Sequence, residues 1–363
     1  MRKIPVILIT LMGLMSAVSV CPDAYSQQMK DITSEHLLMR MPKERTLLGR
    51  DVLIDLERFY KFLDGAIDVR LPRQIVLLVD WERQESRTNY REVSIIVGMN
   101  QPIASSLRTF LLKESMREIA RLGLLELSQG AERPEYEFLY EGMIEILVNE
   151  FNHTSRSLES AWVISKFLDE MGQLSLETQR SWPDFSRDHR CFRNAAPGVT
   201  FLLTFRELKG RDKPGKLFKA LRRANLSKSL EEAFDETASE LEAIWLRNVR
   251  QHRIPDEITI SDEEAPQLVG ITLIPEAVKP GDQLKVRFQF KKTESVLLPD
   301  GVFVRDLRTD TVFQAYEDSD AISVAIPIGA ETAPGEYGYS ITAIDESGNL
   351  RQYKGNYEVV GSP

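Results

Sequence analysis

Between residues 47 and 251, apolar residues recur every three or four positions in several long stretches. In the first stretch, residues 47–63, Leu48, Val52, Leu56 and Phe59 follow the period that places side chains on one face of a helix. The same period predicts further helices over residues 105–127, 138–151, 158–171, 199–208, 216–224 and 230–251. The first part of the chain is therefore expected to be mostly helical.

Two apolar runs of strand length, residues 74–80 and 92–97, interrupt the helical pattern. They flank a charged stretch, residues 81–90, which is predicted to be a loop. Residues 27–46 are polar with scattered methionines and leucines, which indicates an N-terminal leader or a loosely packed strand. Together these patterns predict an α+β domain over residues 47–253, with a small sheet.

After residue 266 the period changes from helical to alternating, with turn residues between short apolar runs. Strands are predicted over residues 268–274, 283–290, 301–307, 321–327, 335–345 and 353–359. Such a rhythm is typical of an immunoglobulin-like β-sandwich, although the paired cysteines of antibody domains are missing. We therefore predict an all-β sandwich over residues 267–363. The acidic stretch at residues 254–266 is predicted to be a linker and the preferred site of limited proteolysis.

The first 26 residues have the pattern of a secretory signal peptide. Arg2 and Lys3 precede an apolar run over residues 4–20, and residues 24–26 (Ala-Tyr-Ser) form a small-residue cleavage site. The run is short for a membrane span, and no later stretch is long enough to be one. The signal predicts an exported protein in a bacterial periplasm or outside the cell.

Cysteine usage agrees with export. Cys21 lies inside the signal, so Cys191 is the one thiol left after cleavage, and an internal disulfide is excluded. Lipidation at Cys21 is the less favoured alternative, because a lipoprotein signal has a small residue before the cysteine and this chain has the bulky Val20.

Charge narrows the choice of partners. The whole chain has 46 basic and 55 acidic residues, a formal net charge of −9. Nucleic acid binding depends on neutralising phosphates with lysine and arginine. We therefore expect no nucleic acid partner.

A charged pattern in the middle of the helical part carries the candidate chemistry. Arg117, Glu118 and Arg121 lie on the predicted helix 105–127, with the arginines at positions i and i+4. Glu141 opens the next predicted helix, 20 residues after Arg121. This separation suits two antiparallel helices joined by a turn, so the four side chains are expected to face one another.

The spacing of Arg117, Glu118, Arg121 and Glu141 resembles the active-site motif of the gluzincin (peptidase MA-like) family of thermolysin-like zinc metallopeptidases. That family places two histidines at i and i+4 on one helix, a glutamate beside the first, and a further glutamate on the next helix. Residues 138–142 (Phe-Leu-Tyr-Glu-Gly) and 240–245 (Glu-Leu-Glu-Ala-Ile-Trp) resemble other segments of the family. The resemblance covers about residues 47–250 and implies a zincin-like fold. In an alternative register, residues 113–117 occupy the motif position, again without histidine.

The same comparison argues against catalysis. Arg117 and Arg121 stand at the two histidine positions, and a guanidinium has no lone pair for a metal. We therefore expect no catalytic residues, no metal and no cofactor at Arg117, Glu118, Arg121 and Glu141. Instead, the arginines are expected to pair with the glutamates and replace the charge of the metal.

Several of these features have simpler interpretations. The four charged residues are also compatible with ordinary salt bridges on a solvated helix face. His189 and Cys191 are better explained by a surface loop than by a Cys/His site, and the sequon at Asn152 is a triplet that is frequent by chance.

We expect a binding or scaffold module of the cell envelope rather than an enzyme. Its protein or peptide ligand is expected to pair with an edge strand over residues 92–97, whose ends are Glu92 and Val97. Two alternatives stay open: a hydrolase that recruits metal through Glu118, Glu141 and a distant histidine, and a purely structural domain whose cleft is filled by its own arginines.

Overall fold

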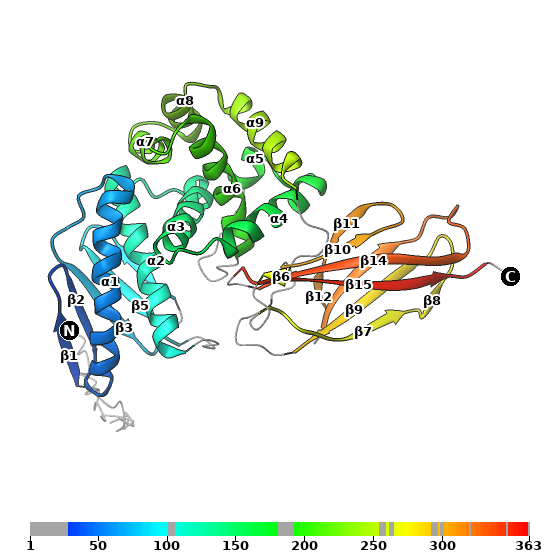
Figure 1. Cartoon of the computed structure of the whole chain (residues 1–363), viewed down its shortest axis with the longest axis horizontal. Coiled ribbons are helices and arrows are strands. Elements are labelled where there is room, and N and C mark those ends of the chain that lie inside the picture. Colours follow the sequence, from blue (N-terminus) through cyan, green and yellow to red (C-terminus); the bar gives the residue numbers. More distant parts are fainter. Residues whose placement is uncertain are drawn as a thin grey trace, which may run out of the picture.

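The computed structural model describes residues 28–83, 85–100, 106–180, 192–253, 259–260, 265–291, 297, 301–318, 321–345 and 348–361. Figure 1 shows a mixed sheet-and-helix region followed by an all-β region, which agrees with the predicted α+β class. The predicted signal peptide at residues 1–26, Cys21, His189 and Cys191 lie outside the described residues.

One five-stranded sheet opens the first region. Its order is β1-β2-β3-β5-β4, in which β2, β3 and β5 run parallel while β1 and β4 are antiparallel to their neighbours. The strands span Met29–Thr33 (β1), Leu37–Pro42 (β2), Ile75–Asp80 (β3), Arg87–Asn89 (β4) and Ser94–Gly98 (β5).

The structure changes the interpretation of residues 27–46. From residue 29 onward this stretch forms β1 and β2 instead of a leader, and β2 is an inner strand of the sheet. Leu37, Met39 and Met41 alternate along β2 and are fully buried. Apolar side chains at every second position therefore anchor this strand, although the apolar Leu38 between them obscures the alternation in the sequence.

The edge strand was also predicted wrongly. Residues 92–97 overlap β5, which is an inner strand between β3 and β4. The strand at this edge is β4, inside the stretch predicted to be a loop. Because β4 has only three residues, its side chains are too few to show a strand period in the sequence.

Helices cover the sheet and build the rest of the first region (Figure 1). They span Thr46–Ile67 (α1), Leu107–Ser128 (α2), Glu137–Phe151 (α3), Arg156–Glu170 (α4), Leu176–Arg180 (α5), Phe192–Lys209 (α6), Lys213–Leu221 (α7), Leu226–Phe234 (α8) and Ala238–Gln251 (α9), with short 3₁₀ turns at Lys43–Arg45 and Pro134–Tyr136. None of the described helices is long and apolar enough for a membrane span.

The helix predicted over residues 230–251 is in fact two helices. Asp235 adopts a left-handed conformation (φ 61°) and ends α8, and Thr237 begins α9 with a capping box. In that box the Thr237 side chain accepts from the backbone of Glu240, whose carboxylate accepts from the Thr237 backbone in return. Apolar periodicity continues across the break, so it could not reveal two helices.

Two glycines bring α3 and α6 into backbone contact. A Cβ atom on Gly142 would lie 2.3 Å from the carbonyl carbon of Gly198 and 2.5 Å from the backbone nitrogen of Val199. No side chain fits in that space, so only glycine allows this crossing. The crossing holds one side of α3 against α6, while its charged side faces α2.

The second region is a β-sandwich of two sheets, ordered β11-β10-β14-β15-β6 and β12-β13-β9-β7, with the short β8 beside β15. Its strands span Thr259–Ile260 (β6), Leu268–Ile274 (β7), Ala277–Val278 (β8), Gln283–Phe290 (β9), Val302–Asp306 (β10), Thr311–Gln314 (β11), Tyr316–Asp318 (β12), Ala321–Pro327 (β13), Gly335–Ile344 (β14) and Leu350–Val359 (β15). Leu284, Val286 and Phe288 meet Val304 and Ile341 in its core.

Within the predicted linker, β6 pairs with β15 and so belongs to this sandwich.

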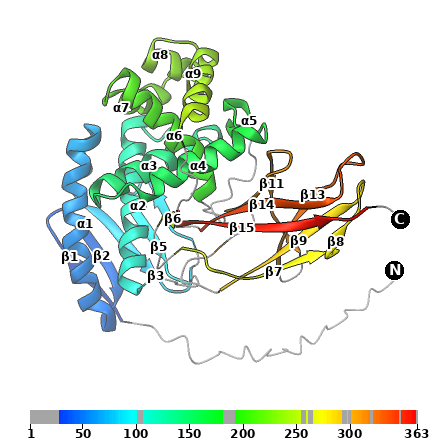
Figure 2. The ribbon, with the colours of Figure 1, turned by 45° about the vertical axis from the view of Figure 1, so that its right-hand side comes forward.

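The two regions share an apolar contact through α4, which lies beside the sandwich in both views (Figures 1 and 2). Phe167 of α4 stacks on Phe303 of β10 with 5.0 Å between ring centroids, and Leu350 joins the same core. The Ser160 hydroxyl donates to the carbonyl of Gly348 over 2.6 Å. The two regions are therefore in direct contact at α4 as well as being joined through residues 254–266.

Candidate functional site between helices α2 and α3

The charged residues of the candidate site lie on the facing sides of two neighbouring helices. Arg117 and Arg121 are one turn apart on α2, and Glu137, Glu141 and Glu145 follow at four-residue spacing on α3. Residues four apart share one face of a helix, so each helix presents its charges as a row. We call these five residues the Arg/Glu ladder.

Each arginine of the ladder lies between two glutamates. Arg117 donates to Glu141 and to Glu145, and Arg121 donates to Glu141 and to Glu137, the last over 2.7 Å. Both carboxylate oxygens of Glu141 therefore accept from arginine, Oε2 from Arg117 and Oε1 from Arg121. The pairing of arginine with Glu141 that we expected from the sequence is confirmed.

The ladder is buried, unlike ordinary surface salt bridges. Arg117 is 8% exposed and Arg121 is 4% exposed. Burial on its own lowers the pKa of each guanidinium, but the facing glutamate charges outweigh it and raise both pKa values above their usual range. The arginines therefore stay charged, and the interpretation as a solvated helix face is wrong.

Two further glutamates connect α2 to the edge of the sheet. The Thr88 hydroxyl, on β4, donates to Oε2 of Glu118 over 2.6 Å, and the Ser86 hydroxyl donates to Oε2 of Glu114 over 3.0 Å. Glu118, the residue beside the first motif arginine, is 1% exposed. The edge strand and the candidate site thus form one hydrogen-bonded unit.

The ladder does not fit a zinc ion. Zinc needs ligand atoms with lone pairs, whereas the guanidinium nitrogens of Arg117 and Arg121 are donors only. Glu141 has both oxygens engaged by arginine, so neither is available to a metal. Among the described residues, the three-residue cluster suited to a metal lies elsewhere, at Glu35, His36 and Glu57.

That cluster is accounted for by pairing within the chain. Lys61 donates to Glu35 over 2.7 Å, and His36 and Ser34 both bond to Glu57. The ammonium group already supplies the positive charge that these carboxylates attract. The alternative of a metal held by Glu118, Glu141 and a histidine therefore has no support in the geometry of the described residues.

Sequence reasoning identified four positions of the site and missed others. Glu137 and Glu145 complete the ladder. Thr88 of β4 and Ser86, the residue just before β4, bond to Glu118 and Glu114 on α2. The repeated four-residue spacing of glutamates on α3 was the available signal for the first two. No signal marked the hydroxyl residues, because they approach the site only through sheet pairing.

The other segments that carried the family resemblance have structural roles here. Trp245 is fully buried, and its Nε1 donates to the hydroxyl of Thr200 on α6 over 3.1 Å.

Asn152, of the glycosylation sequon, is exposed at the carboxyl end of α3.

No protein-family model matches the sequence, and no curated protein matches it either. Among solved structures, an aminopeptidase N family protein from Idiomarina loihiensis is 10% identical with a TM-score of 0.36, over 91% of this chain and 66% of that one. CopC from Methylosinus trichosporium is 18% identical with a TM-score of 0.19, over 27% of this chain and 96% of that one.

A DNA-bound alkylpurine DNA glycosylase, AlkC from Pseudomonas fluorescens, is 12% identical with a TM-score of 0.20, over 71% of this chain and 83% of that one. With TM-scores below 0.5, these similarities assign neither a fold nor a family.

Proposed function

We propose that the first region is a gluzincin-like domain that has lost its metal and acts as a non-catalytic binding or scaffold module. The observation that carries this proposal is the Arg/Glu ladder. Arginine stands at both histidine positions of the motif, and both bind the glutamate that would complete a zinc site. The second region is then an immunoglobulin-like sandwich, and the predicted signal peptide implies export to the cell envelope.

The ladder supplies from within the chain the positive charge that a metal would bring. Glutamates gathered in a buried space without a cation would repel one another and lose their hydration, at a cost of several kcal/mol. Arg117 and Arg121 relieve that cost permanently, because guanidinium groups do not dissociate as a metal does. Loss of the metal therefore leaves a stable frame.

The corrected edge strand is the proposed place for a peptide. Among the described strands, β4 pairs only with β5, so its outer side offers backbone groups to an added strand. Thr88 of β4 bonds directly to Glu118, so a peptide added to β4 would lie near the proposed remnant of the active site. A bound peptide would be held by main-chain hydrogen bonds and would not be cut.

A purely structural role is the second candidate, and the burial of the ladder favours it. With Arg121 only 4% exposed, the ladder itself has little surface to offer a ligand. The two candidates differ at β4, because peptide binding there is required by the first and absent in the second.

Restoring the metal ligands tests the frame directly. The double variant Arg117→His, Arg121→His recreates two histidines one turn apart, opposite Glu141. If the backbone is that of a zinc peptidase, this variant should bind one zinc per chain, measured by equilibrium dialysis and metal analysis. The matched control Arg117→Gln, Arg121→Gln removes the same charges without adding ligands and should bind none.

The native protein provides the other half of the test. It should contain no stoichiometric zinc, and a chelator should leave its melting temperature unchanged. Tightly bound zinc, or peptide hydrolysis that chelator abolishes, would contradict the proposal. A histidine variant that keeps the native circular dichroism but binds no zinc would show that the frame is not zincin-like.

A further inference from the structure

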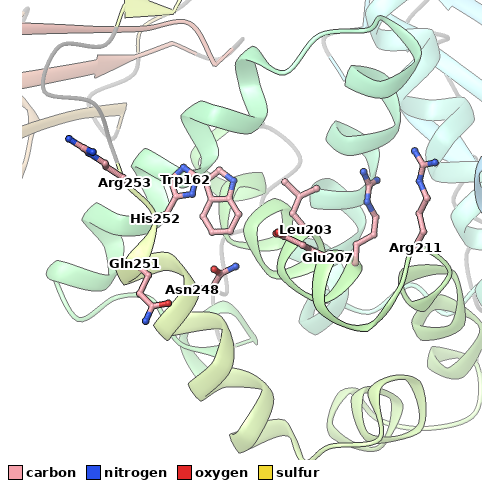
Figure 3. A pocket seen from close by; sticks show the side chains of 9 residues that line it. Trp162, Leu203, Glu207, Arg211, Asn248, Gln251, His252 and Arg253 are labelled. Carbon is pink, nitrogen blue, oxygen red and sulfur yellow. The ribbon is translucent and has the colours of Figure 1, made fainter.

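A second candidate site lies apart from the ladder, in an open cavity of about 800 Å³ between α4, α6 and α9. Figure 3 shows its lining, with Trp162 from α4, Leu203 and Glu207 from α6, and Asn248 from α9. Its volume falls in the range of roughly 300–1,000 Å³ that is usual for small-molecule sites. The cavity is therefore large enough for a small organic ligand.

An aromatic pair forms the middle of this cavity. Trp162 and His252 stack with 4.5 Å between ring centroids and only 10° between their planes. Both residues are half-buried, so part of the pair's surface stays open to the cavity. A planar ring can extend such a stack, and Leu203 offers apolar surface beside it (Figure 3).

Charge divides the cavity into two unlike ends. At one end Arg206 and Arg211 both approach Glu150, at 2.5 and 3.7 Å, and Glu207 adds another carboxylate. Two positive charges therefore meet two negative ones. In Figure 3, Arg253 lies on the opposite side of the Trp162–His252 pair from Arg211, and the described lining residues at that end include no carboxylate.

Near Arg253, a lysine offsets the partial negative charge of a helix end. Arg253 follows the carboxyl terminus of α9, where the helix dipole places that partial charge. The Lys166 ammonium donates to the carbonyl of His252 over 3.3 Å, while Glu159, of opposite charge, also acts on the His252 ring. Arg253 is then the charge that distinguishes this end of the cavity.

We propose that this cavity binds a small organic anion with a planar aromatic body, such as an aromatic carboxylate. The ring extends the Trp162–His252 stack, and the exposed Arg253 side chain, which points away from the pair in Figure 3, turns toward it to pair with the carboxylate. A fork of guanidinium donors matches the two oxygens of a carboxylate. This site is independent of the peptide-binding role proposed for β4.

Naphthalene-2-carboxylate is a suitable probe, titrated into the full chain by isothermal calorimetry. Two analogues separate the contributions: 2-naphthalenemethanol keeps the rings without the charge, and cyclohexanecarboxylate keeps the charge without the aromatic body. Because an ion pair with an exposed arginine changes affinity only a few-fold, 2-naphthalenemethanol should bind about fivefold more weakly. Cyclohexanecarboxylate keeps that ion pair but loses the aromatic stack, which should weaken binding by a similar factor.

The matched variants are Arg253→Gln and Arg247→Gln. Arg247 is exposed on α9, the helix that ends just before Arg253, and does not line the cavity, so its change removes the same charge nearby. Arg253→Gln should weaken binding about fivefold, and Arg247→Gln should leave it within about twofold. Trp162→Leu should weaken the aromatic acid but not cyclohexanecarboxylate, in protein whose circular dichroism is unchanged.

Two results would overturn the proposal. One is a native protein that shows no binding at millimolar carboxylate. The other is binding that Arg253→Gln and Arg247→Gln weaken equally, since that would reflect net charge rather than a site.

Discussion

Two places in this molecule gather arginines, and they use them in opposite ways. In the ladder, Arg117 and Arg121 are buried, and each lies between two glutamates. In the cavity, the side chain of Arg211 is 83% exposed, and Arg253 is exposed as well. The same side chain is thus structural in one place and available to a ligand in the other.

The difference follows from the cost of removing charge from water. A buried guanidinium is stable only with fixed carboxylates at hydrogen-bonding distance, so its partners cannot be exchanged for a ligand. An exposed guanidinium keeps its hydration and loses little when a partner comes or goes. Arginine at a motif position is therefore informative about function only when its burial is known.

The largest expected effect comes from breaking the ladder. Arg121→Ala leaves Glu137 without its arginine and Glu141 with only one, in a space that stays buried. Unpairing a buried ion pair costs about 3–5 kcal/mol of unfolding free energy. Urea unfolding followed by circular dichroism measures this loss.

Arg247→Ala is the control for that measurement, because it removes an exposed arginine from α9. Its expected effect is within about 0.5 kcal/mol. Equal effects of the two substitutions would mean that burial does not distinguish the two kinds of arginine.

Raising the salt concentration should have a smaller effect, and it should weaken ligand binding in the cavity more than it weakens the Arg/Glu ladder. Raising the salt concentration to about 1 M shortens the electrostatic screening length to about 3 Å. The destabilisation by Arg121→Ala should change little, because buried pairs are poorly screened. Binding of naphthalene-2-carboxylate should weaken a few-fold, measured by calorimetry at both salt concentrations. A ladder whose contribution vanishes in salt would be solvent-accessible, contrary to the structure.

The smallest expected effect concerns His252 in the cavity. Burial, and then the charge of Lys166, lower the pKa of His252 below its usual value near 6.5. A lowered histidine pKa contributes stability that is present above the unfolded value and is lost as pH falls through the folded value. Nuclear magnetic resonance titration of the ring, assigned with His252→Gln, should give a pKa below 6.5. A value at or above 6.5 would show that the ring is more solvated than the structure indicates.

Local sequence patterns were sufficient for most elements and for the centre of the site. The i, i+4 spacing of Arg117 and Arg121, and the 20 residues to Glu141, predicted which charges meet. A continuous apolar run predicted β3, and apolar alternation predicted β7 and β9, nearly to the residue. These features depend on neighbouring residues within one helix or strand, so the spacing of residue types in the sequence is enough to predict them.

Features that depend on contacts between distant segments were missed. Thr88 reaches Glu118 only because β4 folds back onto β5, and three residues are too few to show a strand. β1 shows no clear period because only Ile32 of its residues is buried, and in β2 the apolar Leu38 interrupts the alternation. The cavity combines Trp162 with His252, 90 residues later in the chain, and no local pattern links them.

The sequence by itself determined that arginines stand at positions 117 and 121, and residue identity excludes them as zinc ligands whatever the fold. It also determined the periodic faces of α2 and α3 that carry the charges. Only the tertiary structure decided that the ladder is buried and saturated while Arg253 stays exposed. Burial depends on what packs around a residue, and here the ladder lies between the facing sides of α2 and α3.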